Sequence, residues 1–229
     1  MFSSQNTAAS SGETVWVLGY GQFGQRAVKL LRKTAPTSKI VVVDSQPISE
    51  FQGDVEVVCA DGVEWFAENF TSEADVTKII PALPVHLAAQ WIKKKLTNEQ
   101  RIIHSEKIPD SHLHQFPHPI RLTPHSIVMS YADFICPANC SEPEDLCTYT
   151  QLARPLSLYL LLETTVLGNF KPLIVRSRQF ALGVGGFFPT DLWHLLERVR
   201  ALPETPLLIG TACKCHGIVD GFRHTMVQL

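Results

Sequence analysis

The sequence predicts an α/β fold built around a Rossmann-like parallel sheet, and three observations within the first 44 residues support that prediction. The apolar run 14–18 has the composition of a strand buried on both faces, and it leads directly into the glycine-rich turn 19–24. An amphipathic helix is expected next, and its apolar side comprises Phe23, Ala27, Leu30 and Leu31. A second apolar run, 39–43, ends in Asp44, 20 residues after the last glycine of the turn. This order of elements is the fingerprint of a dinucleotide-binding unit.

Each glycine of the turn has a separate physical role in such a unit. Gly19 permits the tight turn, Gly21 lets the backbone approach a pyrophosphate, and Gly24 lets the helix pack closely on the strand. The pyrophosphate is expected at the unpaired N–H groups and positive dipole end of the helix. The predicted cofactor-binding residues of the turn are Gly19, Tyr20, Gly21, Gln22, Phe23 and Gly24. The alternative is a Rossmann-like half whose nucleotide site is vestigial.

The acid at the end of the second strand favours NAD(H) over NADP(H). The Asp44 carboxylate can accept hydrogen bonds from both ribose hydroxyls, whereas it would repel a 2′-phosphate. No arginine follows in 45–47 to bind such a phosphate. We therefore include Asp44 in the predicted cofactor site.

The runs 15–24, 42–44 and 55–62 together resemble the TrkA-N nucleotide-binding domain of potassium-uptake regulators. The resemblance covers about residues 13–95 and implies an NAD-binding Rossmann domain. In that family an aspartate after the third strand commonly lies near the adenosine, so the resemblance adds Asp61 to the predicted nucleotide site. It assigns no family to the cysteine-rich second half.

Composition limits the class of protein. With 229 residues, of which 45% are hydrophobic and 18% charged, the chain can bury a full core as one large or two small units. A net charge of −2 gives no electrostatic case for binding nucleic acid or an anionic membrane surface. Residues 1–12 lack the basic and apolar segments of an export signal, and the longest apolar stretch, 155–162, is too short to span a bilayer. We expect a cytoplasmic protein without membrane insertion.

Four segments are expected along the chain: a disordered tail (1–12), a dinucleotide-binding domain (13–104), a linker (105–125) and a cysteine-rich α/β segment (126–229). The last segment either extends the first sheet or folds separately, and alternating strands and helices favour a parallel sheet in both cases. The linker is polar, is interrupted by prolines, and carries His112, His114, His118 and His125. A solvated linker is favoured over a metal site because these histidines lack paired spacing with an acid ligand.

A fourth strand, 76–80, and the helix after it, 83–96, complete the expected first domain. The turn between them lies at the carboxyl end of a strand, where open α/β sheets place their ligands. His86 in this turn is therefore a candidate to approach a nicotinamide ring. The alternative is a partly exposed histidine at the start of a helix.

Cysteine placement is the second informative feature. Three cysteines follow a predicted strand, 127–130, at intervals of x3 and x6, and two more follow another predicted strand, 207–210. The predicted metal ligands are Cys136, Cys140 and Cys147, with Cys213, Cys215 or His216 completing the site. Thiolates bind iron and zinc strongly, and an iron–sulfur cluster is favoured over zinc. Unliganded thiols or a redox-active pair are the alternative, and Cys59, in an apolar run, is expected to be a core thiol.

The remaining pattern predicts a helix that opens at 154–155, a strand over 171–175, and a helix capped by Thr190 or Asp191. Between the last two lies the glycine-rich loop 183–189. This loop is suited to bind an anion through backbone N–H groups, with Arg176 and Arg178 adding positive charge. It is equally suited to be a plain turn.

These features favour an NAD(H)-binding redox protein with a cysteine-ligated metal centre. The alternative is a non-catalytic, nucleotide-sensing regulatory module of TrkA-N type, in which the cysteine site is structural or redox-sensing. A small-molecule dehydrogenase is a third option, and its candidate acid, base or anion-binding residues are His86, Arg176, Arg178 and His216. The expected partners are a dinucleotide and an electron-transfer or regulatory protein, and a homodimer is compatible with the sequence. No catalytic residue is assigned, and whether the protein is an oxidoreductase with turnover stays open.

Overall fold

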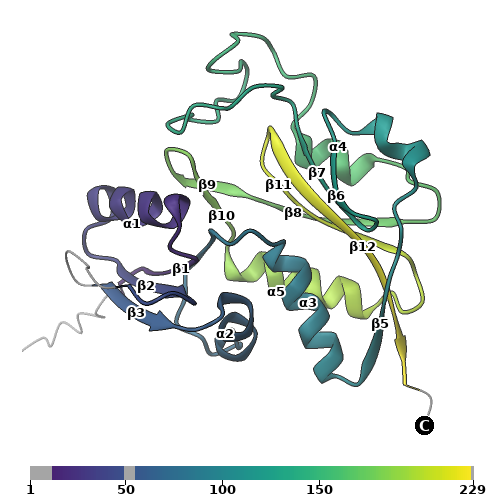
Figure 1. Cartoon of the computed structure of the whole chain (residues 1–229), viewed down its shortest axis with the longest axis horizontal. Helices are drawn as coiled ribbons and strands as arrows, with labels where there is room; N and C mark the ends of the chain where they lie inside the picture. The colour runs from purple at the N-terminus through teal and green to yellow at the C-terminus, as the bar shows by residue number, and fades with distance from the viewer. Residues whose placement is uncertain (1–11, 49–54, 228–229) are drawn as a thin grey trace, which may run out of the picture.

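The computed structural model describes residues 12–48 and 55–227, which form two large sheets separated by a layer of helices, and a small two-stranded sheet (Figure 1). The expected tail, 1–12, lies almost wholly outside the described residues. The first sheet is parallel, and its strand order is β3-β2-β1-β4. Its elements are β1 (Thr14–Leu18), α1 (Gln22–Thr34), β2 (Lys39–Asp44), β3 (Val55–Cys59), α2 (Gly62–Asn69) and β4 (Lys78–Pro81). The predicted Rossmann-like α/β fold is thus present.

Burial explains the apolar composition of the two central strands. Every residue of β1 and the middle of β2 is shielded on both faces. The edge strand β3 is largely exposed, and Cys59 at its end is exposed as well. The expectation that Cys59 is a core thiol was therefore wrong, since an apolar run at the edge of a sheet need not be buried.

Helix α1 packs on the first sheet through Gly24, Ala27, Val28 and Leu31. Phe23 was expected on this apolar side, but its side chain is 73% exposed. With Gly24 against the sheet, the residue one position earlier is turned about 100° around the helix axis. Phe23 consequently points away from the core.

The second sheet is mixed, with the strand order β6-β7-β12-β11-β8 and with β5 paired to the far end of β12. Its strands are β5 (Arg101–Ser105), β6 (Ile120–Thr123), β7 (Ser126–Ser130), β8 (Lys171–Arg176), β11 (Leu207–Ala212) and β12 (His216–Met226). The expected parallel arrangement holds only for β8 and β11. The tight turn 213–215 reverses the chain, so the long strand β12 must pair antiparallel with β11.

Helices cover both faces of the second sheet. Helices α3 (Leu87–Asn98) and α5 (Pro189–Arg200) lie between the two sheets and share one core with β1, α2, β8 and β11 (Figure 1). Helix α4 (Leu158–Thr164) covers the opposite face of the second sheet. Helix α3 begins later than expected because residues 82–86 form a turn after β4. Among the helices of the described residues, none has both the length and the apolar character needed to cross a membrane.

Residues 105–125, expected to be a linker, are part of the second unit. They contain the short 3-10 helix η1 (Asp110–Gln115) and the strand β6, and they bury Ile108 and Phe116. Arg121 holds this segment together by donating to the carbonyl of Ile108 and to Asp110. The sheets therefore separate after β4, since β5 pairs with β12 of the second sheet, while α3 shares a core with both sheets. The polar composition and prolines of residues 105–125 predicted a solvated linker. The prediction was wrong because a few large apolar side chains suffice to anchor such a segment.

The glycine-rich loop 183–189 is a hairpin rather than an open anion cradle. It contains β10 (Val184–Gly186), which pairs with β9 (Arg178–Ala181). Two backbone hydrogen bonds of 3.0 Å join Phe187 to Ile79 of β4 and so tie the two sheets together. Arg178 is paired with Asp191 at the start of α5, and the Arg176 guanidinium lies 4.7 Å from the centre of the Tyr159 ring. Both cations thus already have partners.

Candidate functional site

The glycine turn between β1 and α1 has the geometry of a diphosphate site. Gly19 has a φ of +99°, and a Cβ on it would lie 2.5 Å from the carbonyl oxygen of Ala82. A Cβ on Gly24 would lie 2.0 Å from the carbonyl oxygen of Gly19. At Gly21, in contrast, no heavy atom lies within 4 Å of the Cβ position. Two of the glycines are required by packing, while the third leaves open space beside the backbone.

The amino end of α1 is suited to an anion. Gly21 is its N-cap residue and provides no side-chain acceptor, and the first turn of the helix contains no acidic residue. The N–H groups of this turn and the positive end of the helix dipole therefore face the space above Gly21 without a competing carboxylate.

Asp44 lies beside the same turn at the end of β2. Its Oδ2 accepts from the backbone N–H of Tyr20 at 2.6 Å, and its Oδ1 accepts from the N–H of Gln46 at 2.8 Å. A cavity of about 420 Å³ adjoins it, lined by Tyr20, Gly21, Gln25, Asp44, Gln46, Pro47 and Ile48. Each carboxylate oxygen has a second lone pair, so Asp44 can hold the turn and still accept from a ribose.

Asp61 has a clear structural role. Its Oδ1 accepts from the backbone N–H groups of Val63 and Glu64, both at 2.9 Å, and so caps the amino end of α2. Asp61 is not among the residues that line the cavity at Asp44. The position near an adenosine that the family resemblance implies for it stays a prediction.

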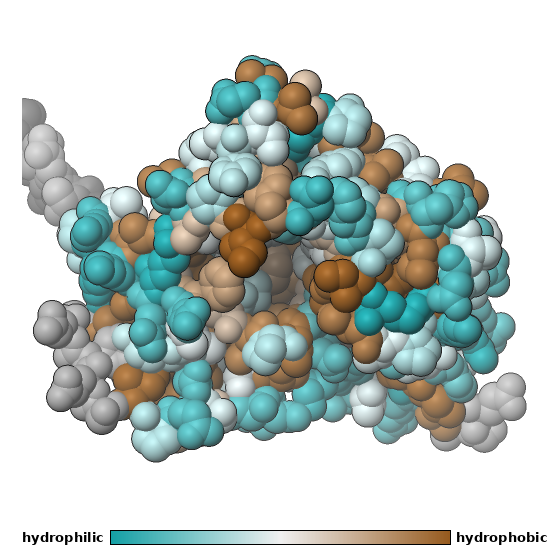
Figure 2. Space-filling view, turned by 45° about the horizontal axis from the view of Figure 1, so that its top comes forward, coloured by the Kyte–Doolittle hydropathy of each residue, from teal (hydrophilic) through white to brown (hydrophobic). Residues whose placement is uncertain are grey.

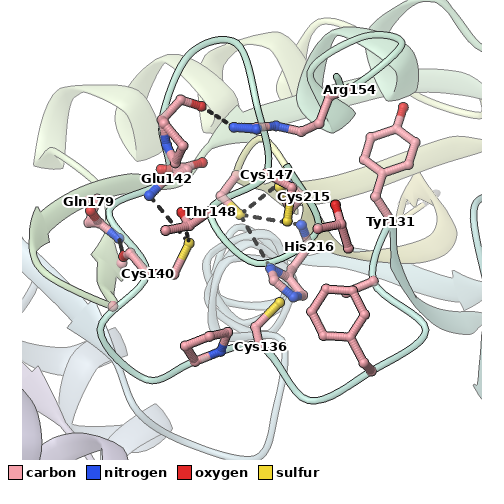
Figure 3. Close-up of a pocket in the computed structure, with 18 of the residues that line it drawn as sticks. Tyr131, Cys136, Cys140, Glu142, Cys147, Thr148, Arg154, Gln179, Cys215 and His216 are labelled. Atoms are coloured by element: carbon pink, nitrogen blue, oxygen red, sulfur yellow. Dashed lines mark hydrogen bonds between the residues drawn. The ribbon is translucent and has the colours of Figure 1, made fainter. Parts of the chain in front are cut away.

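The structure brings the five cysteines of the second half to one cavity of about 710 Å³. Cys136, Cys140 and Cys147 come from the long loop 131–157, which we call the cysteine loop, and Cys213 and Cys215 come from the β11–β12 turn. In Figure 3 the labelled cysteine side chains surround a common space together with Tyr131, Arg154 and His216. Cys59 lies elsewhere, at the edge of the first sheet.

Hydrogen bonds attach the cysteine loop to the β11–β12 turn. Glu142 accepts from the backbone N–H of Lys214 at 2.5 Å, and the Lys214 amine donates to the Glu142 carbonyl and pairs with Glu144. Gln179 donates to the Cys140 carbonyl at 2.7 Å. The cysteine loop is thus joined to the β11–β12 turn, 72 residues away in the sequence, and to β9, 39 residues away.

The thiols differ strongly in acidity. Burial is the main cause that raises the pKa of Cys213 to about 12 and that of Cys215 to about 11, and the negative charge of Glu142 contributes to both. Burial also raises the pKa of Cys136, with Cys140 and Cys147 adding to the effect. The pKa of Cys147 is instead lowered, chiefly by hydrogen bonds from Thr150. Without a bound cation the buried thiols therefore keep their protons at neutral pH, and Cys147 is the readiest to form a thiolate.

Cys213 has the surroundings of a metal-binding thiolate despite its high pKa. Its sulfur accepts from the backbone N–H groups of Cys215 at 3.4 Å and of His216 at 3.3 Å. Such N–H···S bonds stabilise sulfur ligands of metal clusters. Within residues 12–48 and 55–227, however, no three His, Cys, Asp or Glu side chains are arranged to hold a metal ion. The cysteine side chains surround the cavity without converging on one point.

The cysteine cavity reaches the glycine turn. Phe23 and Arg26 of α1 line it, so the helix that begins at the open space beside Gly21 also forms part of the cysteine cavity wall. Figure 2 shows that the molecule is hollowed in this region, with apolar side chains around the opening.

His86 is neither partly exposed nor isolated. Its side chain is buried, and its Nδ1 lies 2.5 Å from the Oδ2 of Asp220 on β12, 134 residues away in the sequence. The pair lines a second cavity of about 1170 Å³, which also includes Cys213 and His216 in its wall. Asp220 was not predicted as a site residue, although a single acid within the apolar run 217–222 is a usable signal.

The four histidines of segment 105–125 do not gather into a site. His112 bonds to Gln115 at 3.1 Å, and His118 bonds to the carbonyl of Ser130 at 3.0 Å. In the part of the chain that the structure describes, neither belongs to a cluster that could bind a metal. Of the two, only His118 bonds to the backbone with its side chain.

One family model, AF_1314_C, described as "Uncharacterized protein, C-terminal domain", matches residues 88–225. The match begins at α3 and includes β5, the cysteine loop and β12, so it covers the second unit as the structure defines it. The glycine turn lies outside it. No curated protein and no solved structure gives a significant match.

Proposed function

The chain belongs to the AF_1314_C family, and we propose that it is an NAD(H)-binding redox protein whose cysteine cavity holds a metal centre, with iron–sulfur favoured over zinc. One observation carries this proposal: α1 has an uncapped amino end with open space at Gly21, suited to a diphosphate, and it lines the five-cysteine cavity with Phe23 and Arg26. A nucleotide site and a thiol-rich site thus share one helix.

The course of the dinucleotide follows from the strand order. In an open parallel sheet, ligands bind outside the carboxyl ends of the strands where the direction of strand addition reverses. That point lies at β1, between β2 and β4. An NAD molecule with its adenosine ribose at Asp44 and its diphosphate above Gly21 would extend its nicotinamide towards the turn after β4, which contains His86.

The metal centre is supported by the chemistry of the donor set. Five thiols and His216 line one cavity, and the cysteine loop that carries three of the thiols is irregular backbone between β7 and α4. Burial raises the pKa values of Cys213 and Cys215 because a buried thiolate is poorly solvated. A bound metal cation would stabilise these thiolates, so their protons would be released on metal binding. An iron–sulfur cluster would supply one-electron chemistry and zinc would supply structure alone. Nicotinamide delivers two electrons as hydride, so direct transfer to a cluster is not part of the proposal.

A second function is favoured by one specific observation. The thiol of Cys147 is little buried and has a lowered pKa, which are the properties of a redox-sensing cysteine. In this alternative the protein senses a nucleotide and the oxidation state of its cysteine loop, without turnover. Reversible oxidation of Cys147 in metal-free protein that binds NADH normally would favour it.

The experiment measures both halves of the proposal on one sample. Protein purified without oxygen is analysed for iron, sulfide and zinc, its visible absorption is recorded before and after dithionite, and NADH is titrated by fluorescence. We expect a brown protein that bleaches on reduction and binds NADH more tightly than NADPH. Colourless protein with one zinc would support a structural site instead. Absence of binding by any pyridine nucleotide would overturn the dinucleotide half.

A further inference from the structure

The buried pair His86–Asp220 belongs to neither the glycine turn nor the cysteine cavity, although its own cavity shares Cys213 and His216 with the latter. The Nδ1–Oδ2 distance of 2.5 Å and the side-chain exposures of 3% and 5% mark a tightly held, desolvated pair. In the tautomer with its hydrogen on Nδ1, the ring donates to the carboxylate and keeps a lone pair on Nε2. That Nε2 is buried and has no hydrogen-bond partner among the described residues. A buried polar atom left without a partner is costly, which indicates that a ligand completes this site.

Neighbouring groups give the pair a defined polar setting. Gln90 and Lys93 follow His86 at i+4 and i+7 and therefore lie on the same face of α3. Ser126 is opposite Asp220 in the β7–β12 register, and its side chain is on the same face of the sheet. Lys93 is largely buried, which lowers the pKa of its amine, while Asp220 acts in the opposite direction. The Asp220 charge thus faces two basic side chains of one helix.

The cavity beside the pair suggests the ligand's chemistry. Its polar lining includes His86, Gln90, Ser126 and Asp220, together with His118, His125, Ser130 and His216. Its wall includes the apolar side chains of Leu83, Val85, Ile120, Leu122, Val128 and Ile218. None of its described lining residues is a lysine or arginine, so histidines are the only side chains in that wall that could offer a counter-charge to an anionic ligand. An uncharged molecule with an apolar body and one hydroxyl fits both parts of the wall.

We propose that this cavity is a substrate site for an uncharged, apolar secondary alcohol, whose hydroxyl donates to His86 Nε2. The inference rests on the proposed NAD(H) binding and deepens it, because His86 precedes α3 in the turn towards which the nicotinamide would extend. In the reaction the carbinol C–H bond breaks, and its electron pair passes as hydride to C4 of NAD⁺. The hydroxyl proton passes to Nε2 of His86, and a C=O double bond forms. The alcohol is oxidised to a ketone, NAD⁺ is reduced to NADH, and one proton is released from His86.

The first test concerns the site alone and needs no nucleotide. Nitrogen NMR of the histidine rings in the unmutated protein should show His86 with its hydrogen on Nδ1. Cyclohexanol, used as the probe, should then shift the Nε2 resonance in the direction of hydrogen-bond acceptance. A neutral ring with its hydrogen on Nε2, or no shift up to the solubility limit of cyclohexanol, would overturn the proposal.

The second test concerns the reaction. With NAD⁺ and cyclohexanol, the unmutated protein should form NADH, followed by absorbance at 340 nm. His86→Gln should reduce kcat at least 100-fold, and Asp220→Asn should do the same because an amide in place of the carboxylate favours the other ring tautomer. Both variants should keep the Kd for NADH. His114→Gln, an exposed histidine on η1, is the matched control and should change neither quantity.

The outcomes separate this inference from the proposed function. Protein that binds NADH but forms none from cyclohexanol and NAD⁺ would overturn the substrate site while leaving dinucleotide binding intact. Protein that binds no nucleotide would overturn the proposed function and the reaction together, and the NMR titration would still decide the alcohol site. Circular dichroism of each variant identifies any that fails to fold, and the NMR test on the unmutated chain does not depend on them.

Discussion

The glycine turn and the cysteine cavity present chemistry in opposite ways. The turn offers backbone: N–H groups at the start of α1, open space at Gly21, and one carboxylate from the neighbouring strand. The cavity offers side chains: five thiols and an imidazole from two loops that meet through Glu142 and Lys214. Ligand binding at the glycine turn depends on the positions where a Cβ atom would clash. Ligand binding in the cysteine cavity depends instead on how firmly its two loops are held. The two regions should therefore respond to different kinds of substitution.

The largest effect is expected from glycine substitutions, which should separate packing from binding. Gly24→Ala places a Cβ 2.0 Å from a backbone oxygen, so we expect the free energy of unfolding to fall by more than about 4 kcal/mol, with loss of the folded first sheet. Gly21→Ala meets no atom within 4 Å, so its thermal unfolding should be nearly unchanged while NADH binding weakens at least tenfold. Thermal melts and NADH titrations of both variants give the comparison. Equal NADH affinity in Gly21→Ala and unmutated protein would contradict a diphosphate at that position.

The second prediction concerns the side-chain region. Cys213→Ser and Cys140→Ser should each lower the bound metal to below about one fifth of the unmutated amount, because a hydroxyl is a far weaker ligand than a thiolate. Cys59→Ser is the matched control, since Cys59 is exposed on β3 and remote from the cavity, and it should retain the full amount. Metal analysis of protein purified without oxygen provides the measurement. Unchanged metal content in both cavity variants would show that Cys213 and Cys140 are not metal ligands.

The same contrast explains what could be predicted from the sequence. The glycine turn, its helix and Asp44 lie within 31 residues, 14–44, and their order alone predicts a strand, a turn and a helix, as the structure shows. The pairs Glu142–Lys214 and His86–Asp220 are separated by 72 and 134 residues, and no local pattern brings them together. The end of the first sheet after β4, which is earlier than predicted, was missed for a related reason. The same holds for the strand β12. Helix α3 is amphipathic in either unit, and only tertiary packing decides which sheet it covers.

Thiol reactivity should distinguish the members of the cysteine cavity from one another. A lowered pKa means that the thiolate of Cys147 is present at lower pH than an ordinary thiol, while Cys213, with a pKa of about 12, stays protonated through pH 9. In metal-free protein, iodoacetamide at pH 7.5 should therefore modify Cys147 at least tenfold faster than Cys213. Peptide mass spectrometry over a time course measures both rates. Similar rates at the two positions would indicate that the cysteine loop is not held as described.

The smallest effect is expected at Asp44, where charge and loop geometry can be separated. Asp44→Asn keeps an oxygen that can accept from Tyr20 N–H but removes the charge that repels a 2′-phosphate. We expect the ratio of the Kd for NADPH to the Kd for NADH to fall about tenfold, which corresponds to the loss of about 1.4 kcal/mol of repulsion of the 2′-phosphate. Asp44→Ala should narrow it similarly and also weaken both nucleotides, because the turn loses the acceptor that holds it. Fluorescence titrations with both nucleotides measure the two effects, and an unaltered preference in Asp44→Asn would place the ribose away from this carboxylate.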